Sequence, residues 1–303
     1  MAANRLASRS EGSSVGGDRT FGWWAGSSLR PIIYGLLIVG ALVQVYPIFF
    51  LLMNTLKTDT QILNTPFSLP TGFSMAPFID VWTGDRTGMF FGRYFFNSVI
   101  VLAATLVLML AISCLCGYAM ARGHFPGNGT LHQALLLSLA VPAHALAIPL
   151  YFFVGSLGLR NSLFGLTLVY AALGAPFTII LMRAYFMHMP LELEEAARID
   201  GCGRLGVFLR IVMPISRGPI AGMAIININW IWSELFFSLI LMNKADVRTL
   251  PLAIALYKPA PMTVETVLAL QYAAMALATI PVLILFFIFQ RQIASGMTMG
   301  AFK

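Results

Sequence analysis

Long stretches without a charged side chain alternate with short polar stretches along this chain. A helix needs about 20 apolar residues to cross the hydrocarbon core of a bilayer, and each charge-free stretch is long enough for one such helix. The pattern therefore predicts six membrane spans. They lie at about residues 32–55 (between Arg30 and Lys57), 95–120 (Arg93 to Arg122), 131–155 (Arg122 to Arg160), 162–186 (Arg160 to Arg183), 217–243 (after Arg217, with Glu234 inside) and 265–291 (Glu265 to Arg291).

Prolines within or at the edges of these spans predict bent helices. A proline removes a backbone donor, and in lipid this is tolerated only where a neighbouring helix or a wet cavity satisfies the freed carbonyl. The prolines concerned are Pro47, Pro142, Pro149, Pro176 and Pro281. We therefore expect kinked spans that pack together.

The composition agrees with a protein that crosses the membrane several times. Of the 303 residues, 58% are hydrophobic and 10% are charged, and the mean hydropathy is +0.82. Soluble domains carry roughly 25% charged residues. The formal net charge of +7 does not indicate a nucleic-acid partner, because Lys and Arg of membrane proteins collect in cytoplasmic loops. Cys114, Cys116 and Cys202 show neither disulfide nor metal-site spacing, so no metal site is predicted.

The distribution of basic residues predicts the orientation. An even number of spans places both termini on one side of the membrane, and most of the 19 Lys and Arg residues fall on that side. By the positive-inside rule, both termini are expected to be cytoplasmic. The predicted organisation is a flexible cytoplasmic tail (1–30), a first span (31–56), an external loop (57–93), a core of five spans (94–295) that includes a polar cytoplasmic loop (188–214), and a cytoplasmic C-terminal tail (296–303).

The loop between the fourth and fifth spans is far more polar than the segments around it. Pro190 suits a first helical turn, and the glutamates that follow it favour the positive end of a helix dipole, so a short helix is expected to begin there. Glu194 and Arg198 are four residues apart and can pair on one face, while Gly201 suits a left-handed stop. A second short helix should then run through residues 208–213 into the fifth span.

One side of the first short helix is thin. At about 100° per residue this side carries Leu193, Ala196, Ala197 and Asp200, and another side carries Leu191, Glu194, Glu195 and Arg198. The backbone of a partner protein could approach the alanines closely, and Glu195 at the margin could meet a basic residue. A helix lying on the bilayer would instead need a broad apolar face with basic residues opposite, which this helix lacks. We therefore predict a docking site for another protein.

The polar loop resembles the signature cytoplasmic loop of the membrane subunits of binding-protein-dependent ABC importers. The resemblance is carried by Glu195, Ala196, Ala197, Gly201, Ile211 and Pro214, with Met213 where the family usually has Leu. Further segments resemble the carbohydrate-importing branch of this family and, within it, the smaller membrane subunit of the maltose transporter. They are residues 97–100, 117–122 with 125–127, 158–162, 230–234 and 296–303.

This resemblance implies an all-α polytopic fold, that of a type I ABC importer permease with six transmembrane helices and a cytoplasmic coupling helix, in the bacterial cytoplasmic (inner) membrane. It implies that the chain forms half of the translocation path for a sugar or oligosaccharide. The implied partners are a second homologous membrane subunit, two ATP-binding subunits, an external solute-binding protein and membrane lipid. The implied contacts with the ATP-binding subunits are Glu195, Ala196, Ala197, Asp200, Gly201, Ile211 and Pro214, together with Gly300 and Lys303 near the C-terminus.

No active site is expected in the chain itself. None of its lysines belongs to a Gly-Lys-Ser/Thr phosphate-binding loop, so ATP and Mg²⁺ are expected in the partner ATPase and no cofactor is expected here. One alternative is a self-sufficient secondary transporter, which would show an internal repeat and ion-coupling carboxylates at the midplane. Another is a membrane-embedded enzyme acting on lipid-linked sugars, which would show clustered Asp, Glu or His at the membrane edge.

Glu234 is the one acidic side chain within a predicted span, and Asn227, Asn229 and Trp230 lie nearby in the sequence. An ionisable group inside a membrane is costly and by default suggests a function, so these four residues are candidates for the solute path. The alternative is that Glu234 is a buried carboxylate that hydrogen-bonds neighbouring helices. Neutral, acidic and phosphorylated sugars all remain open as the solute.

Overall fold

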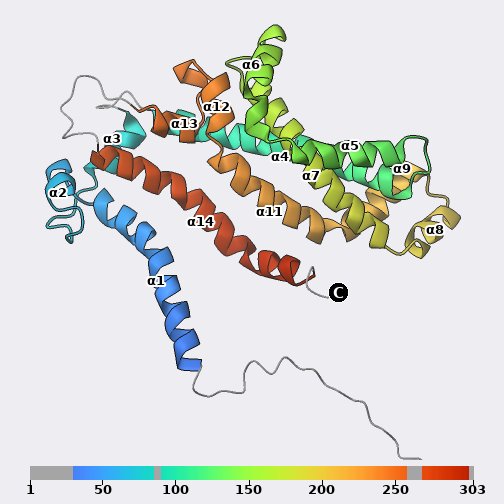
Figure 1. Cartoon of the computed structure of the whole chain (residues 1–303), viewed down its shortest axis with the longest axis horizontal. Helices are drawn as coiled ribbons and strands as arrows, with labels where there is room; N and C mark the ends of the chain where they lie inside the picture. The colour runs from blue at the N-terminus through green and yellow to red at the C-terminus, as the bar shows by residue number, and fades with distance from the viewer. Residues whose placement is uncertain (1–29, 85–89, 258–267, 300–303) are drawn as a thin grey trace, which may run out of the picture. The chain divides into compact units, whose positions relative to one another are not determined.

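The computed structural model describes residues 30–84, 90–257 and 268–299, and every regular element in these ranges is a helix. Residues up to Phe50 and residues from Leu51 onward form two separate compact units, and each is described by itself. The elements (Figure 1) are α1 (Arg30–Thr55), α2 (Asp59–Asn64), α3 (Ala76–Thr83), α4 (Phe91–Arg122), α5 (Asn128–Ala140), η2 (Ala143–Leu146), α6 (Ala147–Ser156), α7 (Leu163–His188), α8 (Glu192–Ile199), α9 (Arg204–Val207), η3 (Phe208–Val212), α10 (Met213–Ile215), α11 (Arg217–Ser233), α12 (Phe236–Leu241), η4 (Ala245–Val247), α13 (Leu250–Ala255) and α14 (Leu268–Met299).

Four of these helices are long and apolar enough to cross a membrane, namely α1, α4, α7 and α14. Two bent pairs in the described part of the chain also pass this test: α5 with the η2–α6 segment, and the α9–α10 segment with α11. Counting each pair as one span gives the six that the charge pattern predicted. The predicted first, second and fourth spans agree with α1, α4 and α7 to within a few residues.

Helices α4 and α7 lie side by side and make the most extensive helix contact in the second unit (Figure 1). Gly117 of α4 permits the close approach, because a Cβ there would lie 3.0 Å from the backbone nitrogen of Arg183 and 3.2 Å from the carbonyl oxygen of Ile179. A Cβ on Gly174 of α7 would lie 2.6 Å from the sulfur of Met109. Small residues are typical of helix contacts in membranes, where close packing replaces the hydrophobic effect as the driving force.

The bend predicted at Pro142 in the third span is confirmed, and it is a complete break between two helices. Helix α5 ends at Ala140, and the segment from η2 through α6 turns away from it by 92°. Val141 has a ψ of 121°, the extended conformation that a residue before proline prefers. Pro142 has no N–H with which to continue the helix. The proline therefore breaks this span rather than only bending it.

The fifth predicted span is also interrupted. Helix α11 ends at Ser233, Glu234 is extended with a ψ of 121°, and α12 begins at Phe236. At the other end of α11, Ser216 separates it from α10, and the chain bends there by 72°. The predicted run from the polar loop into the fifth span is therefore divided at Ser216, and the span itself is divided at Glu234.

Two asparagines hold the segment that connects α12 to α13. The side-chain amide of Asn97 in α4 donates to the carbonyl oxygens of Asp246 (3.0 Å) and Arg248 (2.9 Å). Asn161, before α7, has a φ of 54°. Its Oδ1 accepts hydrogen bonds from the backbone N–H groups of Asn243 (2.5 Å) and Lys244 (2.9 Å). Both asparagines belong to segments that carry the family resemblance. Their hydrogen bonds give these two residues a structural role, which is to hold the connection between α12 and α13.

A buried lysine organises the segment that follows α1. The ammonium of Lys57 donates to the carbonyl oxygens of Thr65 (3.1 Å) and Pro66 (2.8 Å), and burial lowers the pKa of this ammonium below its usual value. Asp59 accepts a hydrogen bond of 2.7 Å from the N–H of Ala269 in the first turn of α14, where a carboxylate is favourable. The segment around α2 is therefore anchored to α14 within the second unit.

Candidate functional site

Helix α8 carries the polar cluster of the loop between α7 and α11. It begins at Glu192 with Leu191 as its N-cap residue, so it starts later than the predicted position, Pro190. Three glutamates occupy its first turn, where the helix dipole favours negative charge. Gly201 ends it with a φ of 84°, the left-handed conformation that the sequence predicted, and its N–H donates to the carbonyl oxygen of Arg198 (3.0 Å).

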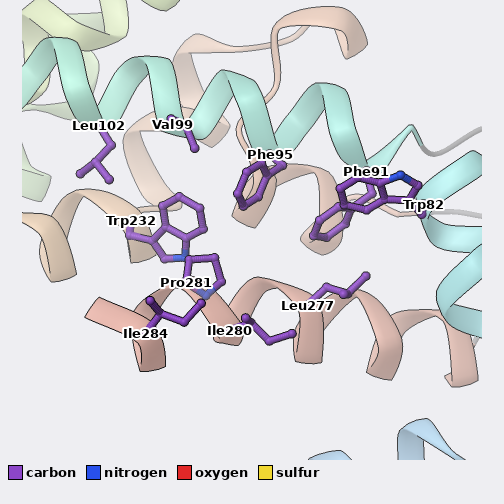
Figure 2. A pocket seen from close by; sticks show the side chains of 10 residues that line it. All are labelled: Trp82, Phe91, Phe95, Val99, Leu102, Trp232, Leu277, Ile280, Pro281 and Ile284. Carbon is purple, nitrogen blue, oxygen red and sulfur yellow. The ribbon is translucent and has the colours of Figure 1, made fainter. Parts of the chain in front are cut away.

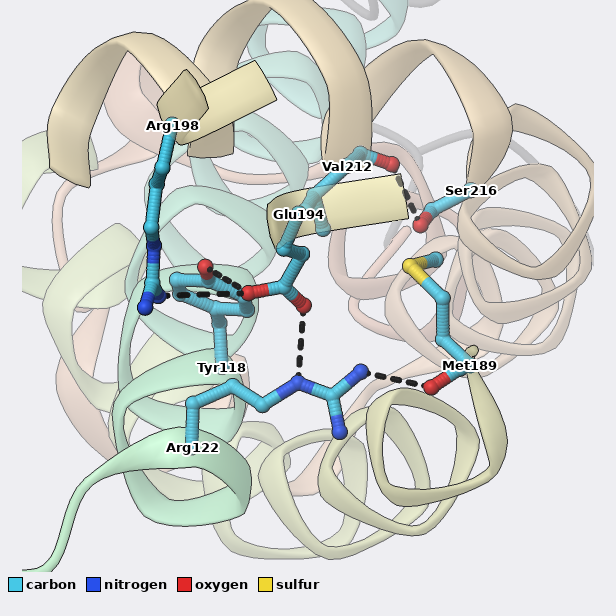
Figure 3. Close-up of polar contacts among 7 residues, drawn as sticks. All are labelled: Tyr118, Arg122, Met189, Glu194, Arg198, Val212 and Ser216. Carbon is cyan, nitrogen blue, oxygen red and sulfur yellow. Dashed lines mark hydrogen bonds and ion pairs between the residues drawn. The ribbon is translucent and has the colours of Figure 1, made fainter. Parts of the chain in front are cut away.

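Glu194 is the centre of a polar network that joins three elements (Figure 3). Its side chain is 1% exposed, and its Oε1 lies 2.7 Å from Nε of Arg122. The Tyr118 hydroxyl donates to Oε2 (2.8 Å), and Nη2 of Arg122 donates to the carbonyl oxygen of Met189 (2.7 Å). Arg198 is more distant, with its Nη2 3.8 Å from Oε2 and its side chain 53% exposed. Helix α8 therefore contacts the end of α4 directly, and through Arg122 it is linked to Met189, the residue that follows α7.

The predicted pair of Glu194 and Arg198 is present at 3.8 Å, but the closer partners of the buried Glu194 are Arg122 and Tyr118, which the spacing did not predict. A buried carboxylate is tolerable only with a compensating charge and hydrogen bonds, and here Arg122 and Tyr118 supply them. These partners are 72 and 76 residues away in the sequence, so no local spacing indicates them. One signal was available: Arg122 closes the second span, which places it at the same border as the loop.

The two alanines of the loop motif lie on different sides of α8. Ala196 is exposed. Ala197 is buried in an apolar cluster, so the predicted common face of the alanines is wrong for Ala197. The cluster contains Cys114, Met182, Phe186, Met189, Val207, Phe208 and Val212. The side that the chain leaves open, called the outer face of α8 below, consists of Glu192, Leu193, Glu195, Ala196, Ile199 and Asp200.

The second half of the loop is helical from Arg204 to Ile215, in the three pieces α9, η3 and α10. The middle piece, η3, is a π-helical turn, a form that is rare and is frequent at functional positions. Pro214 lies two residues after the end of this turn and has no N–H for the carbonyl of Arg210, which explains why regular α-helical bonding is not kept there. Ile211 is half-buried against the cluster that contains Ala197, while Pro214 is exposed.

Glu234 caps the short helix α12. Its carboxylate accepts hydrogen bonds from the backbone N–H groups of Phe237 (2.9 Å) and Ser238 (3.3 Å), and also from the hydroxyl of Tyr170 in α7. Both carboxylate oxygens therefore have donors within the helix bundle. This arrangement supports the interpretation of Glu234 as a carboxylate that hydrogen-bonds neighbouring helices.

The other candidate path residues are not equivalent. Asn227 is buried, and its amide donates to the hydroxyl of Thr178 in α7 (3.3 Å). Trp230 is half-buried, and its ring centroid lies 5.7 Å from that of Tyr170. Asn229 is exposed, and its side-chain amide makes no hydrogen bond to the described part of the chain. Three of the four candidates therefore contact α7, and Asn229 lies on the surface of α11. Gly300 and Lys303 lie outside the described residues.

An apolar pocket of about 450 Å³ lies between α3, α4, α11 and α14 (Figure 2). It is lined by Trp82, Phe91, Phe95, Val99, Leu102, Trp232, Leu277, Ile280, Pro281 and Ile284. The indole N–H of Trp232 already donates to the carbonyl oxygen of Ala278 (3.2 Å). A sugar site needs several placed polar groups, so this pocket does not suit a sugar.

Known proteins are similar to this chain over most of its length. The family described as binding-protein-dependent transport system inner membrane component matches residues 113–299. The diacetylchitobiose uptake system permease protein NgcG of Streptomyces coelicolor is 32% identical, over 90% of this chain and 88% of that protein. The arabinooligosaccharides transport system permease protein AraQ of Halalkalibacterium halodurans is 30% identical, over 90% of this chain and 98% of that protein. The crystal structure of a bacterial ABC transporter involved in the import of the acidic polysaccharide alginate contains a chain with the same fold, with a TM-score of 0.77 and 21% identity, over 88% of this chain and 98% of that chain.

Proposed function

Because this chain belongs to the family of binding-protein-dependent transport system inner membrane components, we propose that it is the subunit through which a separate ATPase drives the uptake of a carbohydrate. It is a multi-pass membrane protein with the fold of an ABC importer permease. We infer that a second, homologous membrane subunit completes the path, that two ATP-binding subunits bind ATP and Mg²⁺, and that an external binding protein delivers the solute. In this arrangement α8 and both termini face the cytoplasm of a bacterial cell.

The proposed docking surface for the ATPase is the outer face of α8. One side of this helix is fixed to the chain through Glu194 and Ala197, and the other side is left open. Ile199 is 86% exposed there, and Leu193 is exposed as well. Apolar side chains that are exposed together beyond the spans are typical of a surface that another protein covers. Glu195 on the same face can pair with a basic residue of that protein. This one-sided attachment is the observation that carries the proposal.

A helix held in this way can pass a displacement to two spans. The ion pair between Glu194 and Arg122 connects α8 to α4. The chain itself continues from α8 through α9, η3 and α10 into α11. When the ATP-binding subunits close on ATP, a movement of the outer face of α8 would reach α4 through the first connection and α11 through the second. We propose that these two spans rearrange the solute path.

We propose an oligosaccharide as the solute and Asn229 as a residue of its path. The similar proteins NgcG and AraQ are named for diacetylchitobiose uptake and arabinooligosaccharide transport. An amide without a partner is costly against lipid, so the exposed side chain of Asn229 fits a water-filled path better. Glu234 and Asn227 are assigned to supporting roles, because their side chains already bond to α7. The substitution Asn229→Leu should lower uptake and leave the assembly of the complex intact.

The docking proposal is tested by Ile199→Asp in the complete complex. An exposed substitution changes the free energy of unfolding by only about 0.5 kcal/mol. A carboxylate that cannot be paired within an apolar contact should weaken the binding of the ATPase by about tenfold or more, and ATP-dependent uptake should fall with it. Leu69→Asp is the control, because Leu69 is also exposed but lies in the segment between α2 and α3. Normal ATPase binding and uptake in Ile199→Asp would contradict the proposal, and uptake by the chain reconstituted without any ATPase would favour a secondary transporter.

A further inference from the structure

Helix α7 contains a single charged residue of the types Asp, Glu, Lys and Arg, and this residue is Arg183. It has no carboxylate partner among the described residues. Its guanidinium faces the ring of His132 in α5, with Nη1 3.4 Å from Nε2. The ion pairs found in the described part of the chain both involve Glu194 instead. A guanidinium in a membrane span without a counter-charge is costly, and such groups normally find a partner.

The pair has more donors than acceptors in either protonation state of His132. When Nε2 accepts from Arg183, the ring proton is on Nδ1, and this atom is buried without a partner. The Nε atom of Arg183 is also a buried donor without an acceptor. A water between His132 Nδ1 and the buried Oδ1 of Asn128, one helical turn away, would satisfy the ring. It would not supply a negative charge for Arg183, so an anion is the missing partner.

The position of the pair along the helices indicates where such an anion would come from. Arg183 lies five residues before His188, the last residue of α7, which at 1.5 Å per residue is about 7.5 Å. His132 lies four residues after Asn128, the first residue of α5, or about 6 Å. Both are thus at the end of the bundle that carries α8, at the depth where headgroups meet acyl chains. No residue of α5 is buried, so the described chain leaves the contact between α5 and α7 open on the side of α5.

We propose that Arg183 and His132 bind the phosphate of an anionic phospholipid. A guanidinium matches a phosphate in charge and can donate two parallel hydrogen bonds to it. In the tautomer with its proton on Nε2, His132 adds a further donor beside the guanidinium, and an anion between the two can accept from both. Basic pockets between membrane helices bind lipid headgroups in this way. The leaflet is the cytoplasmic one, and this assignment rests on the proposed function, which places α8 in the cytoplasm. The lipid would join α5 and α7 next to the network of Glu194.

The test measures which lipids remain bound to the purified complex of this chain with its partner subunits. After a detergent wash, quantitative mass spectrometry should find phosphatidylglycerol retained by the unmodified complex and about tenfold less in Arg183→Gln, since one charge-assisted contact is lost. Arg183→Lys should retain an intermediate amount, because an ammonium keeps the charge and loses the bidentate geometry. Arg217→Gln is the control, since Arg217 is an exposed arginine at the start of α11, and it should retain the full amount.

A second measurement separates a lipid from a free anion. A short-chain phosphatidylglycerol should raise the melting temperature of the delipidated complex, whereas inorganic phosphate at the same concentration should not. Equal lipid retention by the unmodified complex and Arg183→Gln would overturn the proposal, and so would stabilisation by inorganic phosphate alone. A third outcome would also overturn the proposal. If the Arg183→Gln complex loses the second membrane subunit while its lipid content is unchanged, the partner of Arg183 is a carboxylate of that subunit and not a lipid phosphate. Ile199→Asp should keep the lipid, because Ile199 belongs to the outer face of α8 and not to the lipid site. A failure of the docking proposal can therefore be told apart from a failure of the lipid proposal.

Discussion

Removing the Glu194 carboxylate should release α8 while the membrane spans stay folded. In Glu194→Ala, the guanidinium of Arg122 loses its carboxylate and the Tyr118 hydroxyl loses its acceptor. Removing one partner of a buried ion pair costs about 3–5 kcal/mol. Arg122 is 13% exposed and keeps the carbonyl of Met189, so we expect a value near the lower end, about 3 kcal/mol. At about 1.4 kcal/mol per tenfold, local opening of α8 should become about a hundredfold more frequent. Hydrogen exchange of the α8 backbone amides in the intact complex measures this.

Arg198→Ala is the control for this experiment, because Arg198 approaches the same carboxylate from the same helix. Its Nη2 is 3.8 Å away and its side chain is exposed, so its removal should cost only about 0.3–0.5 kcal/mol, or a change in exchange of about twofold. A double-mutant cycle between Glu194→Ala and Arg122→Ala should give a coupling free energy of about 1–3 kcal/mol. Equal exchange in Glu194→Ala and Arg198→Ala, or an additive cycle, would show that the ion pair with Arg122 does not hold α8.

Three further substitutions test other parts of the structure. Gly201→Ala should destabilise the end of α8 by about 1–2 kcal/mol, because an L side chain is strained at a φ of 84°. The control Gly203→Ala should be close to neutral, because Gly203 has a φ of −69°. Equal hydrogen exchange of the loop amides in the two variants would contradict this prediction. Glu234→Leu should lower the free energy of unfolding by about 1–3 kcal/mol for each N–H group of α12 that loses its acceptor. Glu234→Gln should retain uptake. If Glu234→Gln instead loses uptake at an unchanged melting temperature, Glu234 is part of the solute path. Lys57→Met leaves two carbonyl oxygens without their donor and should increase protease cleavage of the segment around α2, and unchanged cleavage would mean that Lys57 does not organise it.

The six spans could be predicted because a long stretch without charge is visible residue by residue. The break after α5 was only partly visible: Pro142 predicted a bend, but its size depends on what the next segment packs against. The break before α12 was not visible, because Glu234 is held there partly by a hydrogen bond donated by the hydroxyl of Tyr170, a residue 64 positions away. Whether a helix is continuous is thus decided partly by neighbours that no local pattern contains.

The same limit applies to the site. The position of α8 and its stop at Gly201 follow from local rules on helix dipoles and left-handed turns. The burial of Glu194 and Ala197 depends instead on α4 and η3, which approach α8 only in the folded chain. A helical wheel therefore found the correct helix, but it placed Ala197 on the wrong side and did not indicate that Glu194 is buried.

Crosslinking from position 196 tests most directly whether an ATPase docks on the outer face of α8. A photoreactive amino acid in place of the exposed Ala196, in the complete complex in membrane vesicles, should become covalently linked to an ATP-binding subunit. The same amino acid in place of Leu69, which is exposed between α2 and α3, should not. Crosslinks from position 196 to lipid alone, or to no protein while the ATP-binding subunits are present, would contradict the proposed coupling site.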